Sequence, residues 1–170
     1  MKKFIISITL ITTVALAGGH NKPGVAPVEN KLYLNECSAC HFAYQPGLLP
    51  ERSWRKLMAN LDNHFDTDAS VDAEDNKSLL DYLTKNAADN STQFKRSRKI
   101  NKKIKKDESP IAVTQTRYFQ HEHKGIPKRF ITQKEVRSLS NCMACHTTAD
   151  RGIYSERAID IPNYGRWDDD

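Results

Sequence analysis

The pentapeptide CSACH at residues 37–41 returns as CMACH at residues 142–146. The chain has four cysteines, and these two pentapeptides use all of them. A disulfide within Cys-x-x-Cys closes so short a loop that it hardly restricts the unfolded chain. A redox-active pair usually lies in a thioredoxin-like βαβ pattern, which is not visible here. A four-sulfur zinc site could use both pairs, but it leaves unexplained why a histidine follows each one.

Haem explains the whole pentapeptide, because Cys-x-x-Cys-His is the attachment signature of c-type haem. The two thiols reach the two vinyl groups on one edge of the porphyrin, and the next residue places its imidazole under the iron. We therefore predict two covalently attached haem c groups. The first is attached through Cys37 and Cys40 with His41 as the proximal iron ligand. The second is attached through Cys142 and Cys145 with His146 as the proximal ligand.

The composition indicates one or two small soluble domains that lack large cores of their own. The chain has 170 residues, of which 38% are hydrophobic, 28% are charged and only 8% are aromatic. Small domains bury too little surface for easy stability, so we expect each haem to form much of the core around it. The net charge of +5 says little about partners unless it is clustered.

The N-terminus has the pattern of a secretory signal peptide. A positive start, MKK, precedes the apolar run FIISITLITTVALA, and Ala15 and Ala17 form a small-x-small cleavage signature. The run is shorter than the roughly 20 residues that a transmembrane helix needs. We predict that residues 1–17 are removed and that the mature protein is periplasmic. Export also argues against a nucleic acid as partner.

The second axial ligand of each iron decides the function, and few residues qualify. Met58 is the remaining thioether, and His20 falls in the mature N-terminus. A helix is expected from Trp54 to Phe65, and His64 ends its apolar stripe, which makes His64 the better ligand for the first haem. For the second haem, His121 and His123 would face the same way on a strand and diverge on a helix. Local chemistry does not choose between these two.

Three further helices are predicted from periodicity and capping signals. A short amphipathic helix leads into the first pentapeptide through Leu32 and Tyr33. Asp72 is the expected N-cap of a helix over the following leucine-rich segment. A third helix is expected to begin with a capping box at Thr132 and to carry residues 136, 139, 143 and 146 on one face.

Residues 95–106 contain eight lysines or arginines and no acidic residue. Such a block is expected to be disordered or weakly ordered in isolation. It is either a solvated linker or a surface that attracts an acidic redox partner or anionic lipid head groups.

Long stretches of the chain resemble the family of small exported dihaem cytochromes c. The resemblance is carried by YLNECSACHFAYQPGLLPERSWRKLMANLDNHF at residues 33–65 and YLTKNAAD at 82–89. It continues in EHKGIP at 122–127 and VRSLSNCMACHTTADRGIY at 136–154. The resemblance spans about residues 33–162. The basic segment after Asn90 looks long for the family, and the tail YGRWDDD matches nothing in it.

The resemblance implies that both haems have two histidine ligands. It assigns His64 to the first haem and His123, rather than His121, to the second. The implied fold is mainly α-helical, with two haem units. Residues 18–90 form an N-terminal unit similar to a class I cytochrome c, residues 91–110 a basic linker, and residues 111–170 a C-terminal unit of one helix and irregular segments.

Electron transfer is the predicted function, without enzymatic activity of its own, because two closed six-coordinate haems expose no iron to a substrate. Family resemblance implies exchange with a small monohaem oxygen-binding cytochrome c, or with a membrane b-type cytochrome. The alternatives are a dihaem peroxidase or small-molecule reductase with one open haem, and a gas sensor with a switchable distal ligand.

Overall fold

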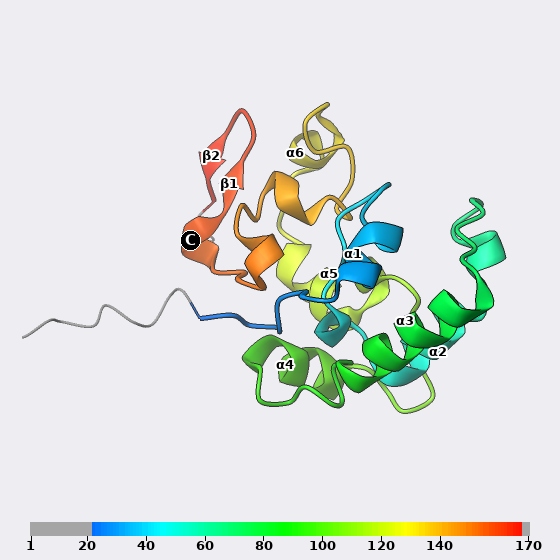
Figure 1. Cartoon of the computed structure of the whole chain (residues 1–170). Helices are drawn as coiled ribbons and strands as arrows, with labels where there is room; N and C mark the ends of the chain where they lie inside the picture. The colour runs from blue at the N-terminus through cyan, green and yellow to red at the C-terminus, as the bar shows by residue number, and fades with distance from the viewer. Residues whose placement is uncertain (1–21, 168–170) are drawn as a thin grey trace, which may run out of the picture.

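The computed structural model describes residues 22–167, which fold into a mainly α-helical structure (Figure 1). The predicted signal peptide at residues 1–17 and His20 lie outside the described residues. The α-helices are α1 (Lys31–Cys37), α2 (Glu51–Met58), α3 (Ala73–Lys85), α4 (Lys95–Lys103), α5 (Arg117–His123) and α6 (Lys128–Thr132). The 3-10 turns are η1 (Pro46–Leu48), η2 (Leu61–Asn63), η3 (Val113–Gln115), η4 (Cys142–Ala144), η5 (Ala149–Arg151) and η6 (Glu156–Ala158). Antiparallel strands β1 (Asp160–Ile161) and β2 (Gly165–Arg166) complete the described fold.

Helices α1, α2 and α3 enclose the first hydrophobic core. Buried side chains from all three helices meet there, including Tyr33, Trp54, Met58, Leu79 and Leu83. The predicted helix before the first pentapeptide is α1, and the predicted N-cap Asp72 begins α3 by accepting a hydrogen bond from the Asp75 amide at 2.8 Å. Both predictions are confirmed.

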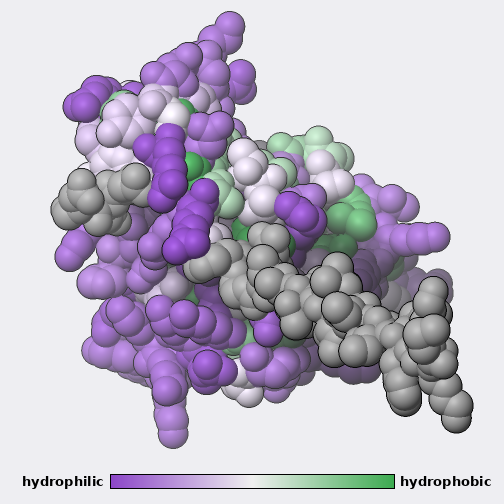
Figure 2. Space-filling view, turned by 90° about the vertical axis from the view of Figure 1, so that its left-hand side faces the viewer, coloured by the Kyte–Doolittle hydropathy of each residue, from purple (hydrophilic) through white to green (hydrophobic). Residues whose placement is uncertain are grey.

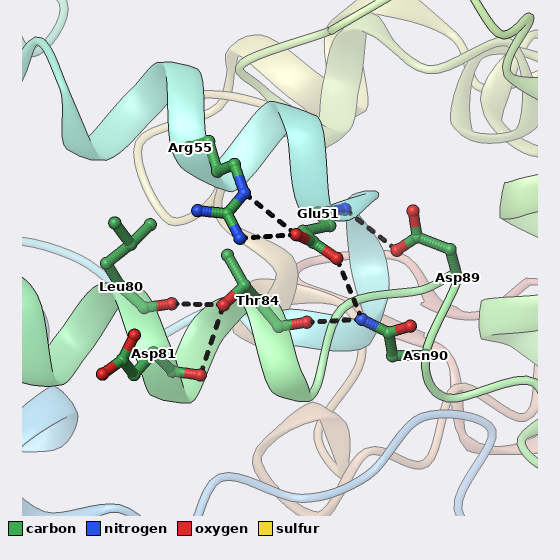
Figure 3. Close-up of polar contacts among 7 residues, drawn as sticks. All are labelled: Glu51, Arg55, Leu80, Asp81, Thr84, Asp89 and Asn90. Atoms are coloured by element: carbon green, nitrogen blue, oxygen red, sulfur yellow. Dashed lines mark hydrogen bonds and ion pairs between the residues drawn. The ribbon is translucent and has the colours of Figure 1, made fainter.

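The N-terminus of α2 is capped from outside its own sequence, because Pro50 offers no side-chain acceptor. The Asp89 carboxylate, beyond the end of α3, accepts a hydrogen bond from the Glu51 amide at 2.9 Å (Figure 3). Glu51 also forms an ion pair with Arg55 at 2.6 Å and accepts a hydrogen bond from Asn90 at 3.2 Å (Figure 3). These contacts fix the end of α3 against the start of α2.

The single helix expected from Trp54 to Phe65 is wrong in length. Helix α2 ends at Met58, and the chain continues through η2 before it reaches His64. Phe65 and Asp66 then have positive φ values of 53° and 65°, which no α-helix accommodates. The apolar stripe therefore crosses two elements.

The basic segment at 95–106, expected to be disordered or weakly ordered, forms the well-defined helix α4. Its inner face buries Ser97 and Ile100, and Ile104 follows just beyond its end. These isoleucines belong to a second core with Val25, Leu48 and Tyr118. Helix α4 lies in the lower part of the molecule in Figure 1, and the corresponding part of the face in Figure 2 is hydrophilic.

The helix expected from Thr132 through the second pentapeptide is also wrong. Helix α6 ends at Thr132, and Arg137 has a φ of 65°. Within the pentapeptide, the structure has only the short turn η4, which covers Cys142–Ala144. Of the residues expected on one helix face (136, 139, 143 and 146), only Val136 is fully buried. The expected capping box is therefore not formed.

Hydrogen bonds join the beginning of the described chain to its last third. The amides of Gly24 and Val25 donate to the Gly152 carbonyl at 2.8 and 3.3 Å. The Tyr44 hydroxyl donates to the Ser140 carbonyl at 2.6 Å, and the side-chain Nε2 atom of Gln45 donates to the Ala149 carbonyl. The division into two haem units and a linker stays a prediction, and these contacts cross its boundaries. None of the helices in residues 22–167 has the length and apolar character needed to cross a membrane.

Candidate haem sites

The first pentapeptide begins at the last residue of α1 and continues in a turn. Cys37 is half-buried at the helix end, whereas Cys40 and His41 are exposed. The Nδ1 atom of His41 lies 2.8 Å from the Phe42 carbonyl oxygen. When Nδ1 carries the proton and donates it to that carbonyl, the Nε2 lone pair is left for a metal ion.

His64 faces His41 from the loop after η2. Their ring centroids are 6.0 Å apart, with an angle of 31° between the planes. The loop is closed by two backbone hydrogen bonds, from the His64 amide to the Thr67 carbonyl at 2.8 Å and back from the Thr67 amide at 3.2 Å. Met58, the thioether alternative, is buried in the first core against α3.

The second pentapeptide lies against the C-terminal tail. The His146 amide donates to the Cys142 carbonyl at 2.8 Å, which closes one turn across the pentapeptide. His146 also forms an isolated antiparallel bridge with Ile159, and the Asp160 amide donates to the Cys145 carbonyl at 2.9 Å. Both cysteines and His146 line a cavity of about 490 Å³, a size typical of sites for small molecules and cofactors.

His123 reaches this cavity from the C-terminal end of α5. Its ring centroid is 6.1 Å from that of His146, with an interplanar angle of 74°. The ring stacks on Phe119 at 3.9 Å, and its Nδ1 atom lies 2.9 Å from the Phe119 carbonyl oxygen. His121 also lines the cavity but is exposed to solvent. Since both residues lie on a helix, about 100° of rotation per residue separates their side chains widely.

The spacing of both histidine pairs fits one metal ion between two imidazoles. A metal–imidazole bond is about 2.0 Å long and the ring centre lies ~1.1 Å beyond the nitrogen, so two rings on opposite sides of one ion have centres ~6 Å apart. The observed values are 6.0 and 6.1 Å. In addition, the buried Nδ1 atom of His146 has no hydrogen-bond partner within the described structure. The residues therefore fit two haem irons, each between a pentapeptide histidine and a distant one.

Burial favours the neutral imidazole of His64, His123 and His146, which is the form that binds metal. It lowers the pKa of His146 to about 4, and the neighbouring charges of His123 and then Arg96 act in the same direction. Burial is also the main cause that lowers the pKa of His123. For His64, burial and then the proximity of His41 lower the pKa.

A redox-active pair contains a reactive cysteine with a lowered pKa, and Cys37, Cys142 and Cys145 show the opposite shift. Burial raises the pKa of both Cys37 and Cys142 to about 11, and it also raises the pKa of Cys145. No disulfide joins any two of the four cysteines, all of which lie within residues 22–167. Within residues 22–167, no three or more His, Cys, Asp or Glu side chains gather as a zinc site would require.

The sequence reasoning missed a group of polar and aromatic residues between the two sites. The Tyr44 ring lies 5.4 Å from the His41 ring, and the Tyr154 ring lies 5.4 Å from the His146 ring. The Tyr154 hydroxyl donates to the Gln45 side chain at 2.7 Å. Both tyrosines stand within the stretches that carry the family resemblance, but nothing local assigns them a role.

A mainly helical fold with two Cys-x-x-Cys-His sites, each facing a second histidine, defines a c-type cytochrome with two haems. The family model for dihaem cytochrome c matches residues 33–154. The chain therefore belongs to the dihaem cytochrome c family and carries two covalently bound haem c groups.

Solved structures agree with this family. The chain is similar to the dihaem cytochrome c from Rhodobacter sphaeroides, with 39% identity over 76% of this chain and 100% of that one, at a TM-score of 0.67. It is also similar to the dihaem cytochrome c from Shewanella baltica OS155, with 34% identity over 82% of this chain and 98% of that one, at a TM-score of 0.67. A search of curated proteins gave no match.

Proposed function

We propose that this protein is an electron carrier whose two haems are each held between two histidines. His41 and His64 are the ligands of the first haem, and His146 and His123 are those of the second. The observation that carries the proposal is the ~6 Å spacing of both imidazole pairs. The family model supports a c-type cytochrome in general terms.

Haem c supplies reversible one-electron chemistry, and the chain decides whether the iron is open. A distal histidine on each side leaves no position for oxygen or peroxide. Histidine in place of methionine also favours a lower reduction potential. On this basis the protein is a carrier and not an enzyme.

The residues between the sites support electron exchange within the molecule. The His41 and Tyr44 rings are in contact, and Gln45 follows Tyr44 directly in the chain. Gln45 is fully buried and accepts the hydrogen bond of Tyr154, whose ring contacts His146. We infer that this packed route places the two haems close enough for rapid exchange.

The cellular setting is part of the proposal. The signal-peptide pattern at residues 1–17 supports a periplasmic location. We propose that the partner is another redox protein, in line with the family: a small monohaem oxygen-binding cytochrome c or a membrane b-type cytochrome. The exposed lysines on and after α4 form a cationic surface that suits an acidic partner or anionic lipid head groups.

Carbon monoxide separates the carrier from its alternatives. It binds ferrous haem only where an axial position is free, so the reduced wild-type protein is expected to bind none. Stoichiometric binding at one haem in a difference spectrum would instead indicate a peroxidase, a reductase or a gas sensor. The ferric protein should show two low-spin bis-imidazole centres and no near-infrared band of methionine ligation.

Single substitutions assign each distal ligand. His123→Ala should open one haem to carbon monoxide, whereas His121→Ala, a matched change two residues away on α5, should leave both closed. His64→Met should raise the potential of the other haem, because a thioether favours ferrous iron. If His121→Ala opens a haem and His123→Ala does not, the assignment is wrong by two residues. Loss of a ligand in Met58→Leu would exclude His64.

A further inference from the structure

Arg96 lies at the start of α4 and is held among aromatic residues. Its Nη1 atom donates to the Tyr118 hydroxyl at 3.0 Å, and its Nη2 atom donates to the Tyr154 carbonyl at 2.7 Å. The guanidinium carbon also lies 5.7 Å from the Tyr118 ring centroid and 5.1 Å from that of Tyr154. The backbone amide of Arg96 donates to Gly24 at 2.8 Å, which fixes the base of the side chain.

The charge of this guanidinium has no anionic partner in the described chain. The ion pairs found within residues 22–167 are Arg55–Glu51 and Arg117–Glu108. The Nε atom of Arg96 is buried and has no hydrogen-bond partner there. A guanidinium has five donors and binds carboxylates through two of them at once, and a partly buried cation without a counter-charge is costly. Arg96 is therefore placed to bind an anion.

The position of Arg96 indicates which anion it is placed to bind. Arg96 lines the 490 Å³ cavity that contains Cys142, Cys145 and His146. It also lines a neighbouring cavity of about 400 Å³, so it stands in the wall between the two. The other residues that line both cavities are Tyr118, Glu122, Tyr154 and Glu156. A haem attached through the two cysteines would occupy the first cavity and would carry two carboxylates of its own, the propionates.

The acidic side chains near Arg96 form no ion pair with it in the described chain. Glu122 accepts a hydrogen bond from the Tyr118 hydroxyl at 3.3 Å, one residue removed from the guanidinium. The second cavity is otherwise lined by the cations Lys95, Lys99 and Arg157, with Glu156 beside them. A further carboxylate would thus enter a region in which positive groups outnumber negative ones.

We propose that Arg96 binds a propionate carboxylate of the haem attached to Cys142 and Cys145, and that it raises the reduction potential of that haem. The inference rests on the His123–His146 site proposed above. A fixed positive charge disfavours ferric iron, which carries one more positive charge than ferrous iron. Arg96 is thus a positioning residue for the cofactor.

The test compares Arg96→Gln and Arg96→Lys with Arg98→Gln in the mature protein with both haems attached. Arg98 is a matched control because it lies on the same helix, is exposed, and donates to the Thr92 carbonyl at 2.9 Å. Arg96→Gln should shift the one-electron equilibrium of one haem about tenfold toward the ferric form, which lowers its midpoint by about 59 mV. The other haem should keep its potential, and Arg98→Gln should change neither.

A vibrational measurement reports the carboxylate directly. The propionate bending band in the resonance Raman spectrum should move in Arg96→Gln and stay in place in Arg98→Gln. Arg96→Lys keeps the charge but loses the two-pronged geometry. It should therefore retain most of the potential while the band still moves. If Arg96→Gln fails to mature, Arg96→Lys decides by the same band.

Unchanged potentials and an unchanged band in the Arg96 variants would overturn the inference. Equal shifts at both haems would also overturn it, since the effect would not belong to one site. The ferric spectra of the same samples test the ligands separately. Failure of the bis-histidine proposal would appear in the wild-type spectrum, whereas failure of the Arg96 inference would appear only in the comparison of variants.

Discussion

At the scale of single residues, the attachment chemistry is local and the distal ligands are not. Within CSACH and CMACH, covalent spacing alone sets which thiols and which imidazole belong together. His121 and His123 have nearly the same neighbours in the sequence. Their difference arises because α5 is a helix, on which only His123 turns toward His146 and stacks on Phe119.

Gly152 is a residue whose backbone conformation other amino acids adopt only with strain. It has a φ of 70°, and a Cβ atom there would lie 2.2 Å from the Val25 carbonyl oxygen. We expect Gly152→Ala to lower the free energy of unfolding by about 3 kcal/mol, because the left-handed backbone is strained for alanine and because Val25 has to move away from the new Cβ atom. Denaturant titration of the mature protein measures this loss.

Gly165 provides the control for this substitution. Its φ is 94°, but a Cβ atom there would meet nothing within 4 Å. Gly165→Ala should therefore cost only the backbone strain, about 1 kcal/mol. Equal losses in the two variants would show that the approach of Val25 to Gly152 contributes nothing to stability.

At the scale of elements, α4 shows why charge density alone misled the interpretation. The segment is rich in lysine and arginine, but Ser97, Ile100 and Ile104 recur three and four residues apart. That spacing places them on one helix face, which packs into the second core. The periodicity was present in the sequence, and the charged residues occupy the remaining faces.

The exposed lysines of this region should steer an acidic partner. Replacing Lys102, Lys105 and Lys106 by glutamine should slow electron exchange with a small, negatively charged redox protein about tenfold at low salt. The difference should shrink as salt is raised, because screening shortens the range of attraction to about 3 Å at 1 M. Stopped-flow absorbance of the haems measures the rate.

A control variant removes the same charge elsewhere. Lys31, Lys85 and Lys134 are also exposed, and their replacement by glutamine gives the same net charge. This variant should keep most of the wild-type rate. Equal slowing by both triple variants would show that net charge, and not the surface around α4, governs the encounter.

The helix predicted from Trp54, which ends early, and the helix predicted from Thr132, which does not form, were inferred from the same kind of signal. Apolar spacing continued from Trp54 to His64 and from Val136 to His146, but burial does not require one continuous helix. The chain turns at Phe65 and Asp66 in the first case and at Arg137 in the second. Apolar periodicity does not report such left-handed residues.

At the scale of the whole molecule, Gln45 connects the first third of the chain to the last. It is fully buried, and it bonds both the Ala149 carbonyl and the Tyr154 hydroxyl. Gln45→Leu should reduce the free energy of unfolding by about 3 kcal/mol, because two buried polar groups lose their partner. Chemical unfolding followed by haem absorbance measures it.

The exposed residue Gln120 is the matched control for Gln45. Gln120→Leu should change the unfolding free energy by about 0.5 kcal/mol or less. If Gln45→Leu behaves like Gln120→Leu, the hydrogen bonds across the molecule add no stability and the two ends of the chain are joined by other contacts.

The sequence by itself determined the cofactor, the family and the mainly helical class, because these follow from short-range spacing and from long matching stretches. The attachment through the four cysteines and the ligand roles of the four histidines remain predictions that the geometry fits. Only the tertiary structure decided where the helices end and that α4 is ordered. It also decided that Tyr44, Gln45 and Tyr154 lie between the sites and that Arg96 is held against Tyr154. Such contacts join residues 58 to 109 positions apart in the chain, and they depend on packing that no local pattern encodes.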